Sequence, residues 1–173
     1  MEYKIVITGS AAVGKTTAIH SLSDRPPVST DQIATDDLSS VKETTTVAFD
    51  FGEIDLEDGL VVRVYGTPGQ DRFRHMWEII AEGALGFIIL VDATRDDPIA
   101  DLDIYLSNFK QFIEETSAVI GITRAQENPA CEDAIYQHLE ASGQFYPVMP
   151  VDPRSREDMR ETLFSLLAML ECC

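Results

Sequence analysis

The sequence predicts an α/β fold built on a mostly parallel β-sheet. Short apolar runs alternate along the chain with longer amphipathic stretches, the order that parallel strands and their crossover helices produce. A glycine-rich loop stands between the first apolar run and the first amphipathic stretch, which fits the same strand–loop–helix order. With 173 residues the chain is expected to form one domain, residues 1–173, large enough to bury a core unaided.

Six strands and five helices account for the chain in order. The strands are expected at Lys4–Thr8, Val47–Leu56, Leu60–Tyr65, Leu85–Val91, Ala118–Ile122 and Tyr146–Pro150. The helices are expected at Lys15–Ser23, Phe73–Glu82, Asp101–Glu115, Pro129–Ala141 and Ser155–Leu170. The two central runs, 85–91 and 118–122, are apolar throughout, as strands buried on both faces are. Ser155 followed by Asp158 predicts an N-terminal cap for the last helix.

The stretch from the first helix to the third strand departs from this simple alternation. Residues 24–45 are polar and too numerous for an ordinary connection, and loops of such length are usually functional or disordered. In the second strand, apolar residues alternate as far as Phe51 and resume out of phase at Ile54, which indicates a bulge at Gly52. The turn at residues 57–59 then joins the second and third strands as an antiparallel hairpin.

Residues 9–16 read Gly-Ser-Ala-Ala-Val-Gly-Lys-Thr, the G-x-x-x-x-G-K-[ST] pattern of a phosphate-binding loop. Its glycines let backbone N–H groups turn toward phosphate oxygens, and the following helix adds the positive end of its dipole. Lys15 supplies a cation for the β- and γ-phosphates, and the Thr16 hydroxyl is placed for Mg²⁺. The nucleotide contacts expected from this loop are Ala12, Val13, Gly14, Lys15, Thr16 and Thr17. The chain is therefore predicted to bind a nucleoside triphosphate.

Composition limits the partners. The net charge of −17 argues against nucleic acid and anionic membranes, because both bind clustered Lys and Arg. The three cysteines have no metal-ligand spacing, and their odd number suits a reducing cytoplasm. No apolar run reaches membrane-spanning length and no signal peptide opens the chain. We therefore expect a cytoplasmic protein with no transmembrane segment.

A second motif follows the third predicted strand, where residues 65–73 read Tyr-Gly-Thr-Pro-Gly-Gln-Asp-Arg-Phe. It resembles switch II of the small Ras-like GTPases, and its Gly-Thr-Pro-Gly-Gln form is similar to the prokaryotic branch of that family. The run from Lys42 to Gly52 looks like that branch's switch I and following strand. The resemblance covers essentially the whole chain. It implies a six-stranded mixed sheet, with five parallel strands and one antiparallel strand, and about five helices on both faces.

The resemblance also implies ligands, partners and residue roles. GTP and GDP would be the nucleotides, Mg²⁺ the metal, and regulatory proteins, including roadblock-type proteins, would bind switch I (about 24–46) and switch II (about 66–78). The Gly69 amide is expected at the γ-phosphate, and Gln70 is expected to orient the attacking water. Thr46, four residues before Asp50, would place its hydroxyl on Mg²⁺ beside Thr16.

The sequence departs from the family at the metal side of the site. Gly66 stands where the family has an acidic residue that supports Mg²⁺ through water. Members of the prokaryotic branch lack it too, so metal binding need not fail. Asp50 and Asp92 are the candidates to replace that carboxylate.

A second departure concerns the base. The base-reading Asn-Lys-x-Asp motif is replaced by Thr123-Arg124-Ala125-Gln126, which has no ionised acceptor at its last position. Arg124 could still stack over a purine. Asp152 in a later loop is either an alternative acceptor for the base or part of the cap region of the last helix.

Three functions are compatible with these residues. The first is a switch that binds GTP and hydrolyses it slowly, ordering and releasing the two switch segments. The second is a nucleotide-binding scaffold with weak or altered base specificity, because the Asn-Lys-x-Asp motif is replaced. The third is a small-molecule P-loop kinase, which would need an acceptor pocket and an arginine lid, and would give Gly69 and Gln70 no role.

Overall fold

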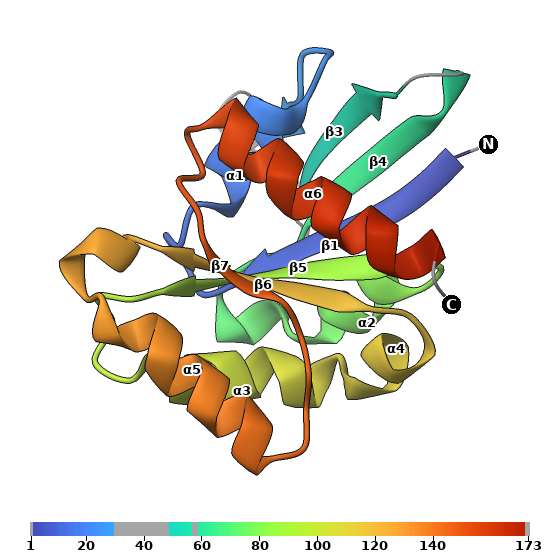
Figure 1. Ribbon diagram of the computed structural model, residues 1–173. Coiled ribbons are helices and arrows are strands. Elements are labelled where there is room, and N and C mark those ends of the chain that lie inside the picture. The colour runs from blue at the N-terminus through green and yellow to red at the C-terminus, as the bar shows by residue number, and fades with distance from the viewer. Residues whose placement is uncertain (1, 30–48, 57–58, 172–173) are drawn as a thin grey trace, which may run out of the picture.

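The computed structural model describes residues 2–29, 49–56 and 59–171, which form an α/β architecture (Figure 1). The strands are β1 (Glu2–Gly9), β2 (Val28–Ser29), β3 (Asp50–Asp55), β4 (Val61–Gly66), β5 (Gly86–Asp92), β6 (Ala118–Thr123) and β7 (Val148–Pro150). They form one sheet in the order β2-β3-β4-β1-β5-β6-β7. Neighbours from β4 to β7 are parallel, whereas β3 runs antiparallel to β4, and β2 antiparallel to β3. The predicted mixed sheet is confirmed, and the two-residue edge strand β2 is its one unforeseen addition in the described residues.

Helices cover both faces of the sheet, as predicted. They are α1 (Lys15–Leu22), α2 (His75–Ala81), α3 (Pro98–Asn108), α4 (Lys110–Glu115), α5 (Ala130–Ala141) and α6 (Arg156–Glu171). Two short 3₁₀ turns, η3 (Asp71–Phe73) and η4 (Ala125–Glu127), precede α2 and α5. Figure 1 shows α1 and α6 on one side of the sheet and α2 to α5 on the other.

The single helix predicted for residues 101–115 is wrong, because the chain forms two helices that meet at Phe109. The first begins earlier than predicted, since the Asp97 side chain accepts a hydrogen bond from a first-turn backbone N–H at 2.9 Å. Phe109 leaves helical geometry, with φ of −99° and ψ of 7°. Its ring is buried, with centroids 5.7 Å from Trp77 and 5.2 Å from Phe87. The break places this ring in the core, and helical periodicity alone does not reveal it.

Two apolar cores lie on opposite faces of the sheet. Successive strand residues point to opposite faces, so β1 contributes Ile5 and Ile7 to the core under α1 and α6. The intervening Val6 belongs to the other core, together with Trp77 and Phe109. All three β1 residues are fully buried. This two-sided burial explains why the central strands read as continuous apolar runs.

The bulge predicted at Gly52 does not occur in the described residues. The pairing of β3 with β4 is continuous from Asp50 opposite Gly66 to Asp55 opposite Val61. Gly52 instead lies under α1, where a Cβ atom would come within 2.9 Å of Ile19. The apolar residues change phase because β3 packs on both faces. The Phe51 ring lies tilted against Tyr65 with centroids 5.0 Å apart, and Ile54 is buried under α1 on the other face.

Candidate functional site

The site lies at the edge of the sheet where the parallel strands end. Because β1, β4, β5, β6 and β7 are parallel, their carboxyl ends meet at the same edge. The phosphate-binding loop follows β1, and the Gly-Thr-Pro-Gly-Gln segment begins with the last residue of β4. Arg124 and the turn η4 follow β6, and the loop containing Asp152 follows β7. The fold therefore brings together four segments that are far apart in the sequence.

The phosphate-binding loop has a backbone that requires glycine at two positions. The φ angle is +148° at Gly9 and +114° at Gly14, in the region that favours glycine. Space is also restricted, because a Cβ atom on Gly9 would collide with the carbonyl oxygen of Leu90. A Cβ atom on Gly14 would lie 2.8 Å from Pro153. The loop is thus fixed between β5 and the segment that follows β7.

Lys15 lies inside this loop. Its ammonium donates hydrogen bonds to the carbonyl oxygens of Gly9 and Ser10, both at 2.7 Å. The residue is only 8% exposed. Burial lowers the pKa of the Lys15 ammonium to about 8, although the nearby Asp50 carboxylate acts in the opposite direction. A partly desolvated cation next to the loop is well suited to an incoming phosphate.

A carboxylate lies directly across the β-ladder from Gly66, the position at which the sequence lacks an acidic residue. Asp50 is the residue of β3 directly opposite Gly66, and its carboxylate accepts a hydrogen bond from the Thr16 hydroxyl. A Cβ atom on Gly66 would lie 2.9 Å from Ile19 and 3.4 Å from the Asp50 Cβ, so a side chain there has little room. Of the two candidate replacements, Asp50 therefore reaches Thr16.

Asp92, the second candidate, has other contacts. Its Oδ1 accepts hydrogen bonds from the backbone N–H and hydroxyl of Thr94 at 2.9 and 2.7 Å. Its Oδ2 forms an ion pair with Arg124. In the described ranges, no group of three or more His, Cys, Asp or Glu side chains is arranged to hold a metal. A metal here would thus depend on few protein oxygens, as Mg²⁺ sites with bound phosphates commonly do.

The segment after β4 packs directly against the phosphate-binding loop. A Cβ atom on Gly69 would lie 2.6 Å from the Lys15 Nζ and 2.7 Å from the backbone nitrogen of Ala11. Gln70 is exposed and lines a cavity of about 180 Å³ together with Lys15, Thr16, Asp50 and Gly69. The indole N–H of Trp77 donates to the carbonyl of Pro68 at 2.8 Å, which ties this segment to α2. Thr46, the other predicted metal ligand, lies outside the described residues.

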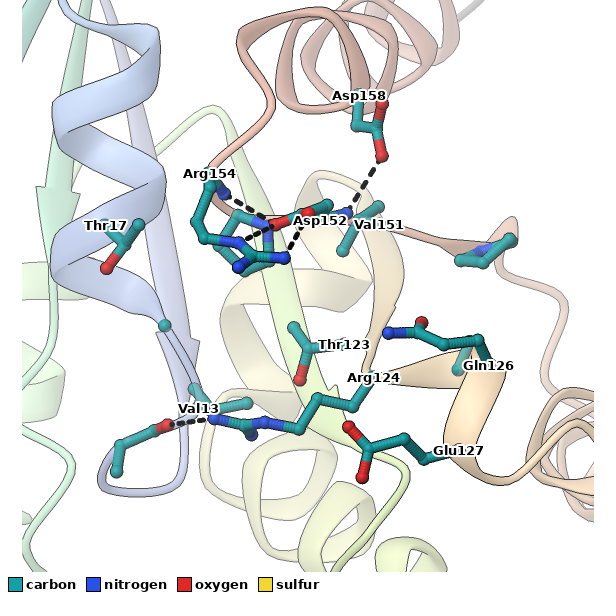
Figure 2. Close-up of a pocket in the computed structure, with 15 residues that line it drawn as sticks. Val13, Thr17, Thr123, Arg124, Gln126, Glu127, Val151, Asp152, Arg154 and Asp158 are labelled. Carbon is teal, nitrogen blue, oxygen red and sulfur yellow. Dashed lines mark hydrogen bonds and ion pairs between the residues drawn. The ribbon is translucent and has the colours of Figure 1, made fainter.

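A larger cavity of about 510 Å³ lies on the other side of the loop (Figure 2). It brings together the predicted contacts Ala12, Val13, Gly14, Thr17, Arg124 and Asp152. The Arg124 guanidinium joins two parts of the site, because it pairs with Asp92 and donates to the Ala12 carbonyl at 3.5 Å. The volume of this cavity falls in the range of small-molecule pockets.

Asp152 lines this cavity but is engaged with Arg154. Its carboxylate accepts from the Arg154 backbone N–H, Nε and Nη2 at 2.9, 2.9 and 2.8 Å, as Figure 2 shows. These hydrogen bonds lower the pKa of Asp152 to about 2. The predicted cap of α6 is confirmed, since Ser155 and Asp158 bond each other at 2.8 and 3.2 Å. Arg154 and Glu127 also line this cavity and were not predicted as site residues, although they lie two residues from Asp152 and three residues from Arg124.

Residues 25–167 match the model of a family described as "Conserved hypothetical ATP binding protein". The chain belongs to this family. The match begins after the phosphate-binding loop, whose assignment therefore depends on its own motif and geometry.

The chain is also similar to three curated proteins. A 95-residue stretch is 32% identical to the uncharacterized protein MJ1339 of Methanocaldococcus jannaschii, covering 54% of this chain and 53% of that protein. A probable Rab-related GTPase of Acanthamoeba polyphaga mimivirus is 24% identical over 110 residues, 62% of this chain and 46% of that protein. The Ras-related protein RABA6b of Arabidopsis thaliana is 27% identical over 119 residues, 68% of this chain and 48% of that protein. The chain spans about half the length of the curated relatives it matches.

Fold, site and relatives agree on a coarse description. The chain is a P-loop nucleotide-binding protein that is distantly similar to Ras and Rab proteins. Membership of the prokaryotic branch stays a prediction, because the relatives named above include a viral and a plant protein. Among the described residues, no helix combines the length and apolarity needed to span a bilayer.

Proposed function

We propose that this chain is a small GTP-binding switch that hydrolyses GTP to GDP slowly with Mg²⁺. One observation carries the proposal. The cavity of about 180 Å³ beside the phosphate-binding loop is lined by Lys15, Thr16, Asp50, Gly69 and Gln70. This set supplies a cation, two oxygen ligands, a glycine packed closely against the phosphate-binding loop and an exposed amide. These are the groups that phosphoryl transfer to water uses.

Each group has a defined task in this proposal. The backbone N–H groups of residues 12–17 bind the phosphates, with Lys15 at the β- and γ-phosphates. The Thr16 hydroxyl and the Asp50 carboxylate are hard oxygen donors that suit Mg²⁺, which would neutralise charge on the phosphate oxygens when bound. Gln70 orients the attacking water, and Thr46 contributes from switch I.

The contacts of Gly69 explain how nucleotide state would reach a partner. Because Gly69 packs against Lys15 and Ala11, a γ-phosphate entering beside Lys15 changes the space open to this segment. The hydrogen bond from Trp77 to Pro68 passes that change to α2. On that helix Ile79 is 62% exposed, and an exposed apolar residue beside a switch is a suitable contact for a protein partner. A regulatory protein of the roadblock type is the partner that we propose to test.

The test begins with nucleotide-free protein titrated with GTP and Mg²⁺, followed by single-turnover hydrolysis. Hydrolysis without an activator is expected at about 10⁻⁴–10⁻² s⁻¹. Lys15→Ala should abolish binding, whereas Gln70→Ala should retain binding and lose most hydrolysis. Lys110→Ala is the matched control, because that exposed lysine pairs only with Glu114 among the described residues. The proposal fails if Lys15→Ala binds GTP as the unmodified chain does.

A nucleotide-binding scaffold is the second candidate. The observation in its favour is that the described residues offer few metal ligands, so that binding without turnover is chemically reasonable. A scaffold would bind triphosphate and lose that binding on Lys15→Ala, yet would show no hydrolysis and no effect of Gln70→Ala. The same two variants therefore separate the candidates.

A further inference from the structure

The larger cavity is the place for the base of the nucleotide, an inference that rests on the proposed nucleotide function. The two cavities flank the phosphate-binding loop and share Ala12 in their walls. Lys15 and Thr16 line the smaller one, while Gly14 and Thr17 line the larger one. A nucleotide whose phosphates lie on the loop and whose terminal phosphate lies at Lys15 must direct its sugar and base toward the larger cavity.

Two arginines supply planar groups to this cavity. Arg124 comes from the end of β6 and is held by Asp92 and the Ala12 carbonyl, while Arg154 is held by Asp152. Figure 2 shows both guanidinium groups at the cavity, with dashed lines between Arg154 and Asp152. Guanidinium planes stack on aromatic rings. Stacking holds any purine and does not distinguish one purine from another.

Discrimination between adenine and guanine therefore depends on hydrogen bonds. The loop after β7 has few free backbone groups that could form them. The backbone N–H groups of residues 151, 152, 154 and 155 are bonded to Ile122, Asp158, Asp152 and Asp152, respectively. Residue 153 is proline and has no N–H. The carboxylates of Asp152 and Asp158 already accept bonds from the same loop. Among the described residues, this loop leaves no uncommitted backbone N–H donor for a base carbonyl.

Among the described residues that line this cavity, Gln126 is the one whose side chain carries an amide. It lies on the turn η4, which is fixed by a hydrogen bond from the Glu127 N–H to the Arg124 carbonyl at 2.9 Å and by the Asn128 side chain bonded to the Ala93 carbonyl at 3.0 Å. Its side chain is exposed, lines the cavity, and in Figure 2 extends its amide toward the space between Arg124 and Asp152.

The chemistry of an amide decides what it can read. A carboxylate is acceptor-only and matches the two adjacent donors of guanine, N1–H and N2–H. An amide carries one acceptor oxygen and one donor NH₂ group. By turning over, it matches either the N6–H donor and N1 acceptor of adenine, or the N1–H donor and O6 acceptor of guanine. We propose that Gln126 reads the base through its amide, and that the cavity therefore accepts adenine and guanine nucleoside triphosphates with similar affinity.

The experiment titrates the nucleotide-free full chain with ATP, GTP and ITP in the presence of Mg²⁺. Inosine has the N1–H and O6 of guanine without the N2 amino group, so an amide reader binds ITP and GTP equally. The three dissociation constants are expected within about ten-fold of one another, because no contact discriminates by more than a single hydrogen bond.

The decisive variant is Gln126→Glu, which changes the amide to a carboxylate at constant size. It should weaken ATP and ITP relative to GTP by about ten-fold or more. Gln137→Glu is the matched control, because it makes the same change on an exposed residue of α5 outside the cavity and should leave all ratios unaltered. Both residues are exposed, so neither change is expected to disturb folding.

Two results would overturn the proposal. One is an unmodified chain that binds GTP about 100-fold or more tightly than ATP, with Glu127→Gln abolishing the preference, which would make Glu127 the reader. The other is a Gln126→Glu variant whose ratios equal those of the unmodified chain. Failure of the proposed function looks different, since no triphosphate would then bind and Lys15→Ala would change nothing; that result overturns both proposals.

Discussion

The buried Lys15 ammonium should make the stability of the nucleotide-free protein depend on pH in a specific window. Burial lowers the pKa of Lys15 in the folded state to about 8, whereas an unfolded lysine keeps its ordinary value of 10.5. Between these values the unfolded state binds more protons, so the free energy of unfolding rises with pH. Below about pH 8 both states are protonated and the cost of burying the charge is fully present. The difference between the two pKa values corresponds to about 3 kcal/mol.

The measurement compares the unmodified chain with Lys15→Met, which removes the titrating group and keeps a side chain of similar length. Urea unfolding without nucleotide, from about pH 7.5 to about pH 10.5, gives the difference in unfolding free energy at each pH. The unmodified chain should gain about 3 kcal/mol relative to the variant across this range. The contributions of other titrating groups to the unfolding free energy cancel in this comparison. The control variant Lys110→Met, at an exposed lysine, should show a difference in unfolding free energy that does not change with pH. A difference between Lys15→Met and the unmodified chain that is independent of pH would refute the reasoning.

Three further predictions concern the loop, the core and the metal. Gly14→Ala should destabilise the protein more than Gly83→Ala in urea unfolding, by about 1 kcal/mol or more, because both glycines have positive φ but only Gly14 has a neighbouring proline 2.8 Å from the new Cβ. Phe109→Ala should lower the free energy of unfolding by about 3–5 kcal/mol, and a loss below about 1 kcal/mol would contradict the packing around this ring. Asp50→Asn should raise the Mg²⁺ concentration needed for half-maximal GTP binding by about ten-fold, whereas Asp55→Asn, at the exposed end of the same strand, should leave it unchanged.

Much of the fold follows from local patterns in the sequence. The apolar runs predict strands because a strand buried on both faces needs no polar positions. The glycines of residues 9–16 predict a loop because its backbone has positive φ angles that glycine adopts most readily. The break at Phe109 and the unbulged pairing at Gly52 could not be predicted, because both depend on neighbours distant in the sequence. Local spacing records what a residue prefers, and it does not record which ring or helix will pack against it.

The same distinction applies to the candidate site. The phosphate-binding loop and the segment at Gly69 were predicted because each lies within one short motif. The contact of Asp50 with Thr16 joins residues 34 positions apart, so sequence reasoning could name Asp50 only as one of two candidates. The ion pair between Asp152 and Arg154 could have been considered from the sequence, since the two residues are only two positions apart. The geometry of the pair, however, depends on the turn before α6.

The hydrogen bond between Trp77 and Pro68 has a practical consequence. Trp77 is the only tryptophan in the chain, and it is 1% exposed. Its ring is fixed against Tyr105 and Phe109, while its N–H is bonded to the segment that packs on the phosphate-binding loop. Intrinsic tryptophan fluorescence therefore comes from a single indole that is anchored in the core and bonded to the segment that packs on the phosphate-binding loop. Any rearrangement of that segment on addition of nucleotide would be followed in real time without a label.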